Sequence, residues 1–250
     1  MILFGRRIPS VFSLLLWFVV WELVGRARFS AIVPPFSAVV AAGFTFVPTE
    51  KFADAAIISL RSFFLGMGSA LLVGVPVGIV MARLESAGRI LGTWVNIFAS
   101  APISAIVPIL MAVLGIGETT VVVTVFLFAV FVIALDTQVG VRQADRSLVE
   151  MARCFGARPW QIYTKVLLLS ALPEMLAGFR LGAIRGVKGV VIGQLLISII
   201  GVGELFELYS QYFLMEEFWA LVIIVFLFAF AVSEAIAFIE RRVEYYAGAR

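Results

Sequence analysis

The sequence predicts an all-α integral membrane protein, a single transmembrane domain over residues 1–250 with about six membrane-spanning helices. Of its residues, 62% are hydrophobic and only 14% are charged, and the mean hydropathy is +1.10. A water-soluble domain needs far more polar surface than this. The apolar residues also fall into runs close to the roughly 20 residues that cross a bilayer as a helix. The predicted spans are about 9–25, 59–82, 90–114, 119–139, 174–200 and 218–239.

The composition also excludes several classes of site. The chain has no histidine, which removes histidine-based triads and most zinc sites. Its only cysteine, Cys154, cannot form an intrachain disulfide. The net charge is +3, and the basic residues lie in loops rather than along a stripe. We therefore expect no metal site, no cofactor and no nucleic-acid partner, and a lipid bilayer as the surroundings.

The N-terminal region predicts one membrane helix followed by a turn. The run 9–25 contains Trp17 and Glu22, which are unusual in the core of a signal peptide, and no clear cleavage site follows it. A retained helix is therefore expected. Pro34–Pro35 then predicts an extended turn, and Ser37 is a candidate N-cap for a short helix.

Two of the predicted spans carry ridges of small residues. Such ridges let helix backbones approach closely in lipid, so we expect both to pack against neighbouring helices. The ridge of 59–82 is Gly66, Ala70, Gly74, Gly78 and Ala82, and that of 174–200 is Gly178, Gly182 and Gly186.

The segment 90–114 combines polar residues with two prolines, Pro102 and Pro108, that are expected to break its helix. Broken helices are tolerated at membrane depth where they face protein or a water-filled path. A lining of the translocation path and hydrogen bonding between helices are both open interpretations. The polar residues that would share one face are Thr93, Asn96, Ser100 and Ser104.

Charged residues inside predicted spans are expensive and need a role. Asp136 is expected to pair with Arg142, or alternatively to be a proton or substrate site. Arg185 and Lys188 lie within 174–200, and Lys188 falls roughly 20 Å along the helix from its start. These two cations are interpreted as part of a path for an anionic substrate. The alternative is an internal ion pair of Lys188 with Glu204 or Glu234.

A polar interruption over residues 140–173 separates the fourth and fifth spans. Apolar residues recur at helical spacing from Arg142 to Phe155, and Glu150 lies four residues from Arg146 and three from Arg153, so both pairs could form along one helix. Gly156 is expected to end this helix. Further on, Pro159 is expected to begin a second short helix and Pro173 to break the chain before the next span.

The loop charges predict an orientation. Lysine and arginine residues concentrate at both termini, in the turn 83–89 and in the loop 140–173. The positive-inside rule then places all of these in the cytoplasm.

The loop 140–173 closely resembles the EAA loop of ABC-importer permease subunits, which reads E-A-A, three residues, G, nine residues, I-x-L-P. Here Glu150-Met151-Ala152 is followed at the same spacing by Gly156 and by Val166-Leu167-Leu168. Met151 replaces the first alanine, and Leu169 stands where the motif has its proline. Pro173 matches a second proline common in the sulfonate/nitrate/taurine branch.

Weaker matches to the same family extend the resemblance over about residues 32–245. They are Ala101–Ile109 (R-x-I-P-x-x-A-x-I-P-L), Gly115–Glu118 (G-I-G-E), Gly178–Leu181 (G-L-R-L) and Ile200–Leu205 (G-L-G).

The resemblance implies a type I ABC importer permease fold in the bacterial cytoplasmic (inner) membrane, with 140–173 as the cytoplasmic coupling loop. The sequence contains no G-x-x-x-x-G-K-[ST] phosphate loop, so this chain is expected to be no enzyme and to rely on a partner ATPase. The implied partners are two ATPase copies, a second permease copy, expected to form a homodimer, and an extracytoplasmic substrate-binding protein. The implied cargo is a small, anionic, sulfonate-, nitrate- or taurine-like solute moved by alternating access. The implied ATPase-coupling residues are Arg146, Glu150, Met151, Ala152, Arg153, Gly156, Ala157 and Pro173.

Two other classes of protein would account for part of the pattern. A self-powered secondary transporter would use Asp136, Lys188 and Glu234 as an ion or proton relay. A membrane assembly subunit without transport activity would use the charged loop only as a docking segment.

Overall fold

The computed structural model describes residues 2–3, 6–7, 10–27, 30–143 and 146–248. Two short strands, β1 (Ile2–Leu3) and β2 (Arg6–Arg7), pair antiparallel, and the rest of the regular structure described is helical. The helices, in chain order, are α1 (Ser10–Arg26), α2 (Phe36–Phe46), α3 (Glu50–Arg83), α4 (Glu85–Ser100), the 3₁₀ turn η1 (Ile103–Ile106), α5 (Val107–Leu114), α6 (Glu118–Gln143), α7 (Arg146–Cys154), α8 (Pro159–Ile162), the π-helical turn η2 (Tyr163–Leu167), α9 (Leu168–Ile197), α10 (Gly201–Gln211) and α11 (Met215–Gly248).

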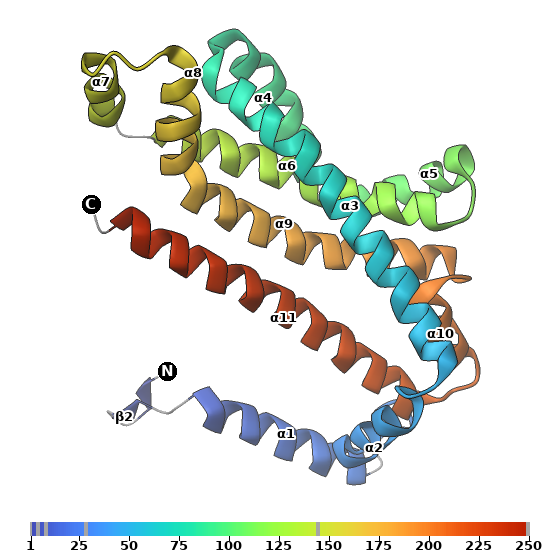
Figure 1. Cartoon of the computed structure of the whole chain (residues 1–250). Coiled ribbons are helices and arrows are strands. Elements are labelled where there is room, and N and C mark those ends of the chain that lie inside the picture. Colours follow the sequence, from blue (N-terminus) through green and yellow to red (C-terminus); the bar gives the residue numbers. More distant parts are fainter. Residues whose placement is uncertain (1, 4–5, 8–9, 28–29, 144–145, 249–250) are drawn as a thin grey trace.

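Long helices dominate the arrangement, with α9 and α11 running side by side and α3 crossing α9 (Figure 1). In the described chain, four stretches are long and apolar enough to cross a membrane: α3, α6, α8 to α9, and α11. The pair α4 and α5 makes a fifth if it is counted as one span, because the two are bent by 87° at the Ala101–Pro102 break. Helix α1 has 17 residues, so the predicted first span lies at the short end of the range that can cross a bilayer.

Helix α6 lies at the centre of the bundle, between α3 and α9, and the predicted small-residue ridges explain why. The ridge of α3 faces α6, and a Cβ atom at Gly78 would lie 2.5 Å from the Ala134 carbonyl oxygen. The ridge of α9 packs against both helices: Gly178 lies against the Asp136 side chain of α6, and Gly186 lies against Met67 of α3. The prediction that these ridges pack helices closely is confirmed. The residues buried here include Val125, Ala129, Ile133, Ala183 and Val187.

A second core joins α2, α10 and the first turns of α3 and α11. Its centre is formed by Val39, Leu205, Phe206 and Leu221, all buried. The segment between the predicted spans 174–200 and 218–239 is not simply a connecting loop, because Gly201–Gln211 forms helix α10. The first turns of α3 also extend the second predicted span back to Glu50, with the Thr49 hydroxyl accepting from the Phe52 amide at 3.3 Å as an N-cap.

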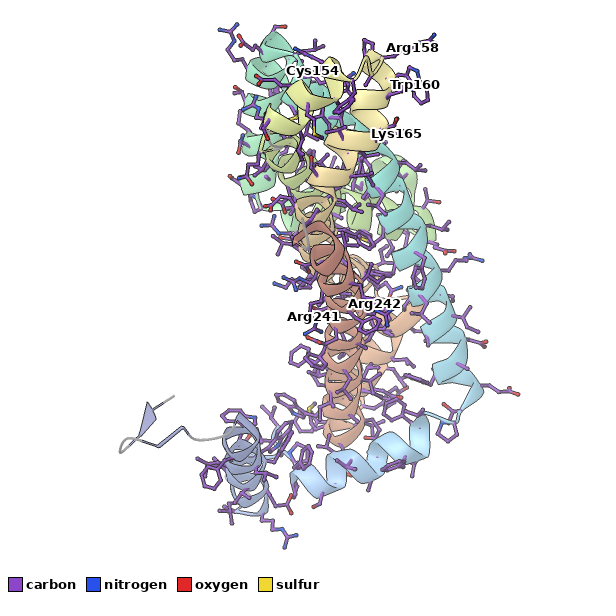
Figure 2. The ribbon with its side chains drawn as sticks, turned by 60° about the vertical axis from the view of Figure 1, so that its left-hand side comes forward. Cys154, Arg158, Trp160, Lys165, Arg241 and Arg242 are labelled. Atoms are coloured by element: carbon purple, nitrogen blue, oxygen red, sulfur yellow. The ribbon has the colours of Figure 1, made fainter. Side chains whose placement is uncertain are left out.

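Helices α7 and α8 lie at the end of the molecule away from α1 and α2. In Figure 2 the labelled residues Cys154, Arg158, Trp160 and Lys165 gather there.

Arg180 of α9 and Glu240 of α11 form an ion pair of 3.1 Å, which joins these two helices.

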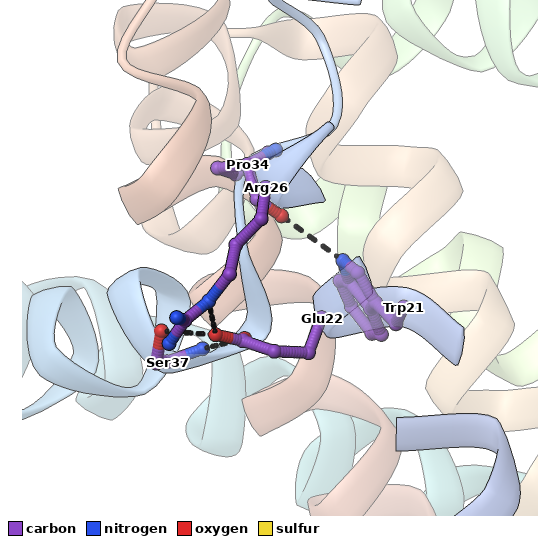
Figure 3. A network of polar contacts seen from close by, with 5 residues as sticks. All are labelled: Trp21, Glu22, Arg26, Pro34 and Ser37. Carbon is purple, nitrogen blue, oxygen red and sulfur yellow. Dashed lines mark hydrogen bonds and ion pairs between the residues drawn. The ribbon is translucent and has the colours of Figure 1, made fainter. Parts of the chain in front are cut away.

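A polar network fixes α1 to α2 (Figure 3). The Glu22 carboxylate accepts hydrogen bonds from the Ser37 amide (2.9 Å), the Ser37 hydroxyl (2.9 Å) and the Arg26 guanidinium (2.6 Å). The Trp21 indole donates to the Pro34 carbonyl at 3.1 Å. The prediction that Ser37 caps α2 is wrong: Pro35 precedes the helix, and Glu22 from another helix satisfies the free amide instead.

Two predicted helix breaks are also absent. Pro108 lies in the first turn of α5, where a missing backbone N–H costs no hydrogen bond. Pro173 lies inside α9, which begins at Leu168 and continues from α8 through the π-helical turn η2. The helix continues past Pro173 because its flanking residues pack on α6, with Ala171 fully buried beside Gly140.

Candidate coupling surface and membrane path

Helices α7 and α8 are joined by a turn that depends on glycine. Gly156 has φ +74°, which a residue with a side chain rarely adopts. The Gly156 amide donates to the Arg153 carbonyl (2.9 Å), and the Ala157 amide reaches back to the Ala152 carbonyl (3.0 Å). This is a Schellman-type helix end. The predictions that Gly156 ends the first helix and that Pro159 begins the second are confirmed.

The two helices expose an apolar and basic surface. The side chains of Phe155, Trp160 and Met151 are 85%, 58% and 52% exposed. Arg153, Arg158 and Lys165 are exposed beside them. Large exposed apolar side chains with a basic border are typical of a protein-binding surface rather than of a loop that only meets water.

The predicted ion pairs of this loop are not formed where the structure describes both partners. Glu150 and Arg153 are both exposed and form no ion pair, because a pair of solvated side chains gains little from association. The side chain of Arg146 lies outside the described part, so its pair with Glu150 stays a prediction. Pro173, the last predicted coupling residue, lies within α9 and is partly buried, away from the exposed surface of α7 and α8.

The end of α6 is bound to the end of α3. Arg142 donates a hydrogen bond to the Met81 carbonyl (3.2 Å), and Gln138 points its amide at the same oxygen (3.4 Å). The predicted pair of Asp136 with Arg142 is therefore wrong. Asp136 lies on the opposite side of α6, against Gly178, where Glu174 and Arg185 are its charged neighbours.

The predicted polar face of α4 is divided in two. Thr93 and Asn96 line a groove of about 650 Å³ together with Gln138 and Arg142 of α6. Their side chains also donate to their own helix, Thr93 to the Arg89 carbonyl (2.8 Å) and Asn96 to the Gly92 carbonyl (2.7 Å). The two remaining predicted path residues, Ser100 and Ser104, are exposed but do not line this groove.

Lys188 lies on an exposed face of α9, and Arg185 is partly buried one turn before it. The predicted internal partners of Lys188 are engaged elsewhere: Glu204 lies 3.7 Å from Lys51, and Glu234 lies 3.2 Å from Arg241. The internal-pair interpretation is therefore wrong. The exposed position is the one that a path-facing or partner-facing lysine needs.

Sequence reasoning missed a buried polar cluster at the C-terminal end of α9. The Gln194 side chain is fully buried, and its carbonyl oxygen accepts from the Ser59 hydroxyl (2.8 Å) and the Val202 amide (3.1 Å). Gly201 has φ +62° and lies against the Gln194 amide, so α10 turns back directly onto it. A polar residue within an otherwise apolar span was the available signal.

Comparison with known proteins agrees with this architecture. A family model described as "Binding-protein-dependent transport system inner membrane component" matches residues 74–245. The taurine transport system permease protein TauC of Escherichia coli is 25% identical over 240 residues, covering 93% of this chain and 87% of that protein. A putative ABC transporter permease protein of Methanocaldococcus jannaschii is 27% identical over 235 residues, covering 89% and 85%.

A shorter match and solved structures extend the comparison. The carnitine transport permease protein OpuCB of Listeria monocytogenes is 30% identical over 148 residues, covering 59% of this chain and 64% of that protein. A chain of the MetNI methionine ABC transporter, solved in inward-facing conformations, superposes with a TM-score of 0.63 and 25% identity, covering 74% of this chain and 93% of that one. The predicted type I importer permease fold is confirmed. The chain belongs to the family of binding-protein-dependent transport system inner membrane components, the permease subunits of ABC importers.

Proposed function

We propose that α7 and α8 form the coupling element through which a partner ATPase drives this permease. The observation that carries the proposal is the exposure of Met151, Phe155 and Trp160 on a helical pair whose turn is set by Gly156. Buried aromatic anchors dominate the energy of most protein interfaces, and these side chains have no covering partner within the described chain.

The bundle provides a route from that surface to the membrane interior. Helix α7 follows directly on α6, and α8 continues through η2 into α9, so both ends of the coupling element join helices of the central core. Close packing of α6 against α3 and α9 favours movement of these three helices as one body. ATP-driven closure of the ATPase pair would then pull the coupling elements of two such permeases together and produce alternating access.

We propose a small solute with an anionic group as the cargo. Lys188 and the neighbouring Arg185 bring positive charge to the middle of a spanning helix, which is costly without a polar path or an anion to face. TauC is named for taurine and OpuCB for carnitine, and both of those molecules carry an acidic group. The relatives support an anionic moiety rather than one particular compound.

The assembly is proposed as two copies of this chain, two ATPase subunits and an extracytoplasmic binding protein, with both termini in the cytoplasm. The basic residues of the turn 83–89, of α7 and α8 and of the end of α11 support that orientation. A membrane-impermeant maleimide tests it at Cys154, which is exposed. Labelling is expected in inside-out vesicles and not in intact cells; the reverse pattern would overturn the orientation.

The experiment that tests the coupling proposal is purification of the tagged chain from native membranes, with mass spectrometry of what remains bound. A stoichiometric subunit that contains a phosphate-loop sequence is the expected result. A chain that purifies alone, and whose uptake stops with a proton uncoupler but not with ATP depletion, would support the secondary transporter instead.

A further inference from the structure

The groove between α4 and α6 includes two of the predicted path residues, Thr93 and Asn96, and the chemistry of its lining suits one kind of ligand. Its volume is about 650 Å³, and its lining contains two cations, Arg89 and Arg142, and no carboxylate. Thr93, Asn96 and Gln138 supply the other polar side chains. Two cations beside three neutral polar side chains, with no carboxylate among them, are the chemistry of an anion site.

Hydrogen-bond donors remain free on both sides of the groove. Arg142 uses one guanidinium nitrogen on the Met81 carbonyl, and a guanidinium has five N–H groups. Arg89 is exposed and forms no side-chain hydrogen bond or ion pair with any residue that the structure describes. Asn96 and Gln138 each direct one amide nitrogen to a backbone carbonyl, which leaves the second N–H of each amide for a ligand.

One of the two glycines in the groove, Gly88, makes room for this arrangement. A Cβ atom at Gly88 would lie 2.5 Å from the Met81 carbonyl oxygen and 2.8 Å from Arg142 Nη2, so only glycine lets the guanidinium reach that carbonyl. Gly92 is open by comparison, with its nearest neighbour, Met81 Cε, 3.8 Å from such a Cβ. The guanidinium of Arg142 is therefore held at the groove rather than free to turn into solvent.

We infer that this groove binds an oxyanion, a phosphate- or sulfonate-type group held between Arg89 and Arg142. Guanidinium groups suit this role because their planar N–H pairs match the oxygens of such anions. The anion would bridge α4 and α6 about one turn before α7 begins. Either a phospholipid headgroup or a soluble oxyanion has this chemistry.

The inference concerns the chain by itself and is tested without an ATPase or a binding protein. The full chain is reconstituted in nanodiscs of phosphatidylcholine, with or without phosphatidylglycerol. Native mass spectrometry then counts retained phosphatidylglycerol. In discs of phosphatidylcholine alone, sulfate is added stepwise while tryptophan fluorescence is measured. Potassium chloride keeps the ionic strength constant. Trp94, beside Thr93 on α4, is the reporter, and Trp94→Phe identifies its share of the signal.

Arg89→Gln is the informative variant because Arg89 supports no described contact, whereas Arg142 also binds Met81. We expect Arg89→Gln to weaken anion binding about tenfold, the loss of one charge-assisted hydrogen bond. Arg89→Lys should keep most of the binding. Arg242→Gln, which removes one positive charge from α11 instead, should change nothing.

The two arms identify the source of the anion. Phosphatidylglycerol that is retained by the wild type and lost in Arg89→Gln indicates a lipid headgroup. A saturable response of Trp94 to sulfate that weakens in Arg89→Gln indicates a soluble oxyanion. If Arg89→Gln matches the wild type in both arms, the inference is wrong.

Discussion

Arg142, in the last turn of α6, donates a hydrogen bond of 3.2 Å to the backbone carbonyl of Met81, near the end of α3. Helix α3 ends at Arg83, so this carbonyl lies where the regular helical bonding of α3 stops, and a side chain from α6 satisfies it. The contact joins α3 and α6 immediately before the chain enters α7. It therefore lies where movement of the coupling element would first reach the bundle.

Gly88→Val should disrupt this junction. A side chain at Gly88 would collide with both the Met81 carbonyl and the Arg142 guanidinium, and overpacking of this kind costs about 1–3 kcal/mol. Thermal unfolding in detergent should show a midpoint lower by several degrees. Gly92→Ala is the control, because its Cβ has 3.8 Å of clearance. Equal midpoints for the two variants would contradict the junction.

Gly156→Glu should abolish co-purification of the ATPase, because it distorts the turn between α7 and α8 and adds a charge to the coupling surface. Gly115 is a matched control: its φ is +84°, and both glycines have open space where a Cβ would lie. Gly115→Glu therefore also introduces backbone strain, but far from α7. ATPase association should survive there, and loss in both variants would point to a general folding defect.

Lys188→Met should reduce uptake strongly while leaving the ATPase bound, because the lysine is exposed on α9 and lies away from the coupling surface. Lys188→Arg should restore part of the transport, since it keeps the positive charge. Lys51→Met is the control for the loss of a lysine charge elsewhere. Lys51 forms an ion pair with Glu204 at the end of the bundle away from α7 and α8. Unchanged uptake in Lys188→Met would remove Lys188 from the path.

Gln194→Leu should destabilise the protein by about 1–3 kcal/mol, because it removes two buried hydrogen bonds that each contribute about 0.5–1.5 kcal/mol. The Ser59 hydroxyl and the Val202 amide both donate to the Gln194 carbonyl oxygen, which joins α3, α9 and α10. Each keeps a second acceptor, the Ala55 carbonyl for Ser59 and the Ser59 hydroxyl for Val202. Gln211→Leu is the control for the same change at the surface, because Gln211 is exposed and so is its hydrogen bond to Glu207. Similar unfolding curves for both variants would show that the buried cluster contributes little.

The features that sequence predicted correctly are those with a local physical cause. The glycine ridges had to face other helices, because small residues are useful only where backbones approach. Gly156 and Pro159 determined a helix end and a helix start through their own backbone preferences. The break between α4 and α5 followed from Pro102 in the same way.

The failures came from contacts between distant segments. Glu22 caps α2 from another helix, and Arg142 binds a carbonyl of α3 rather than the nearby Asp136. Pro173 does not interrupt α9, because packing on α6 outweighs the loss of one hydrogen bond. No local pattern reveals such contacts, because the partner that forms the bond lies on another helix and is distant in the sequence.

Cross-linking from Cys154 tests the central claim most directly. It is the only cysteine, it is exposed, and it is the last residue of α7, so benzophenone maleimide can be placed on the coupling element without changing the chain. The account predicts that illumination of labelled native membranes joins this chain to a subunit with a phosphate-loop sequence. A Cys154→Ser chain labelled instead through Ser210→Cys on α10 should give no such product. Efficient labelling of Cys154 without any ATPase adduct would contradict the account.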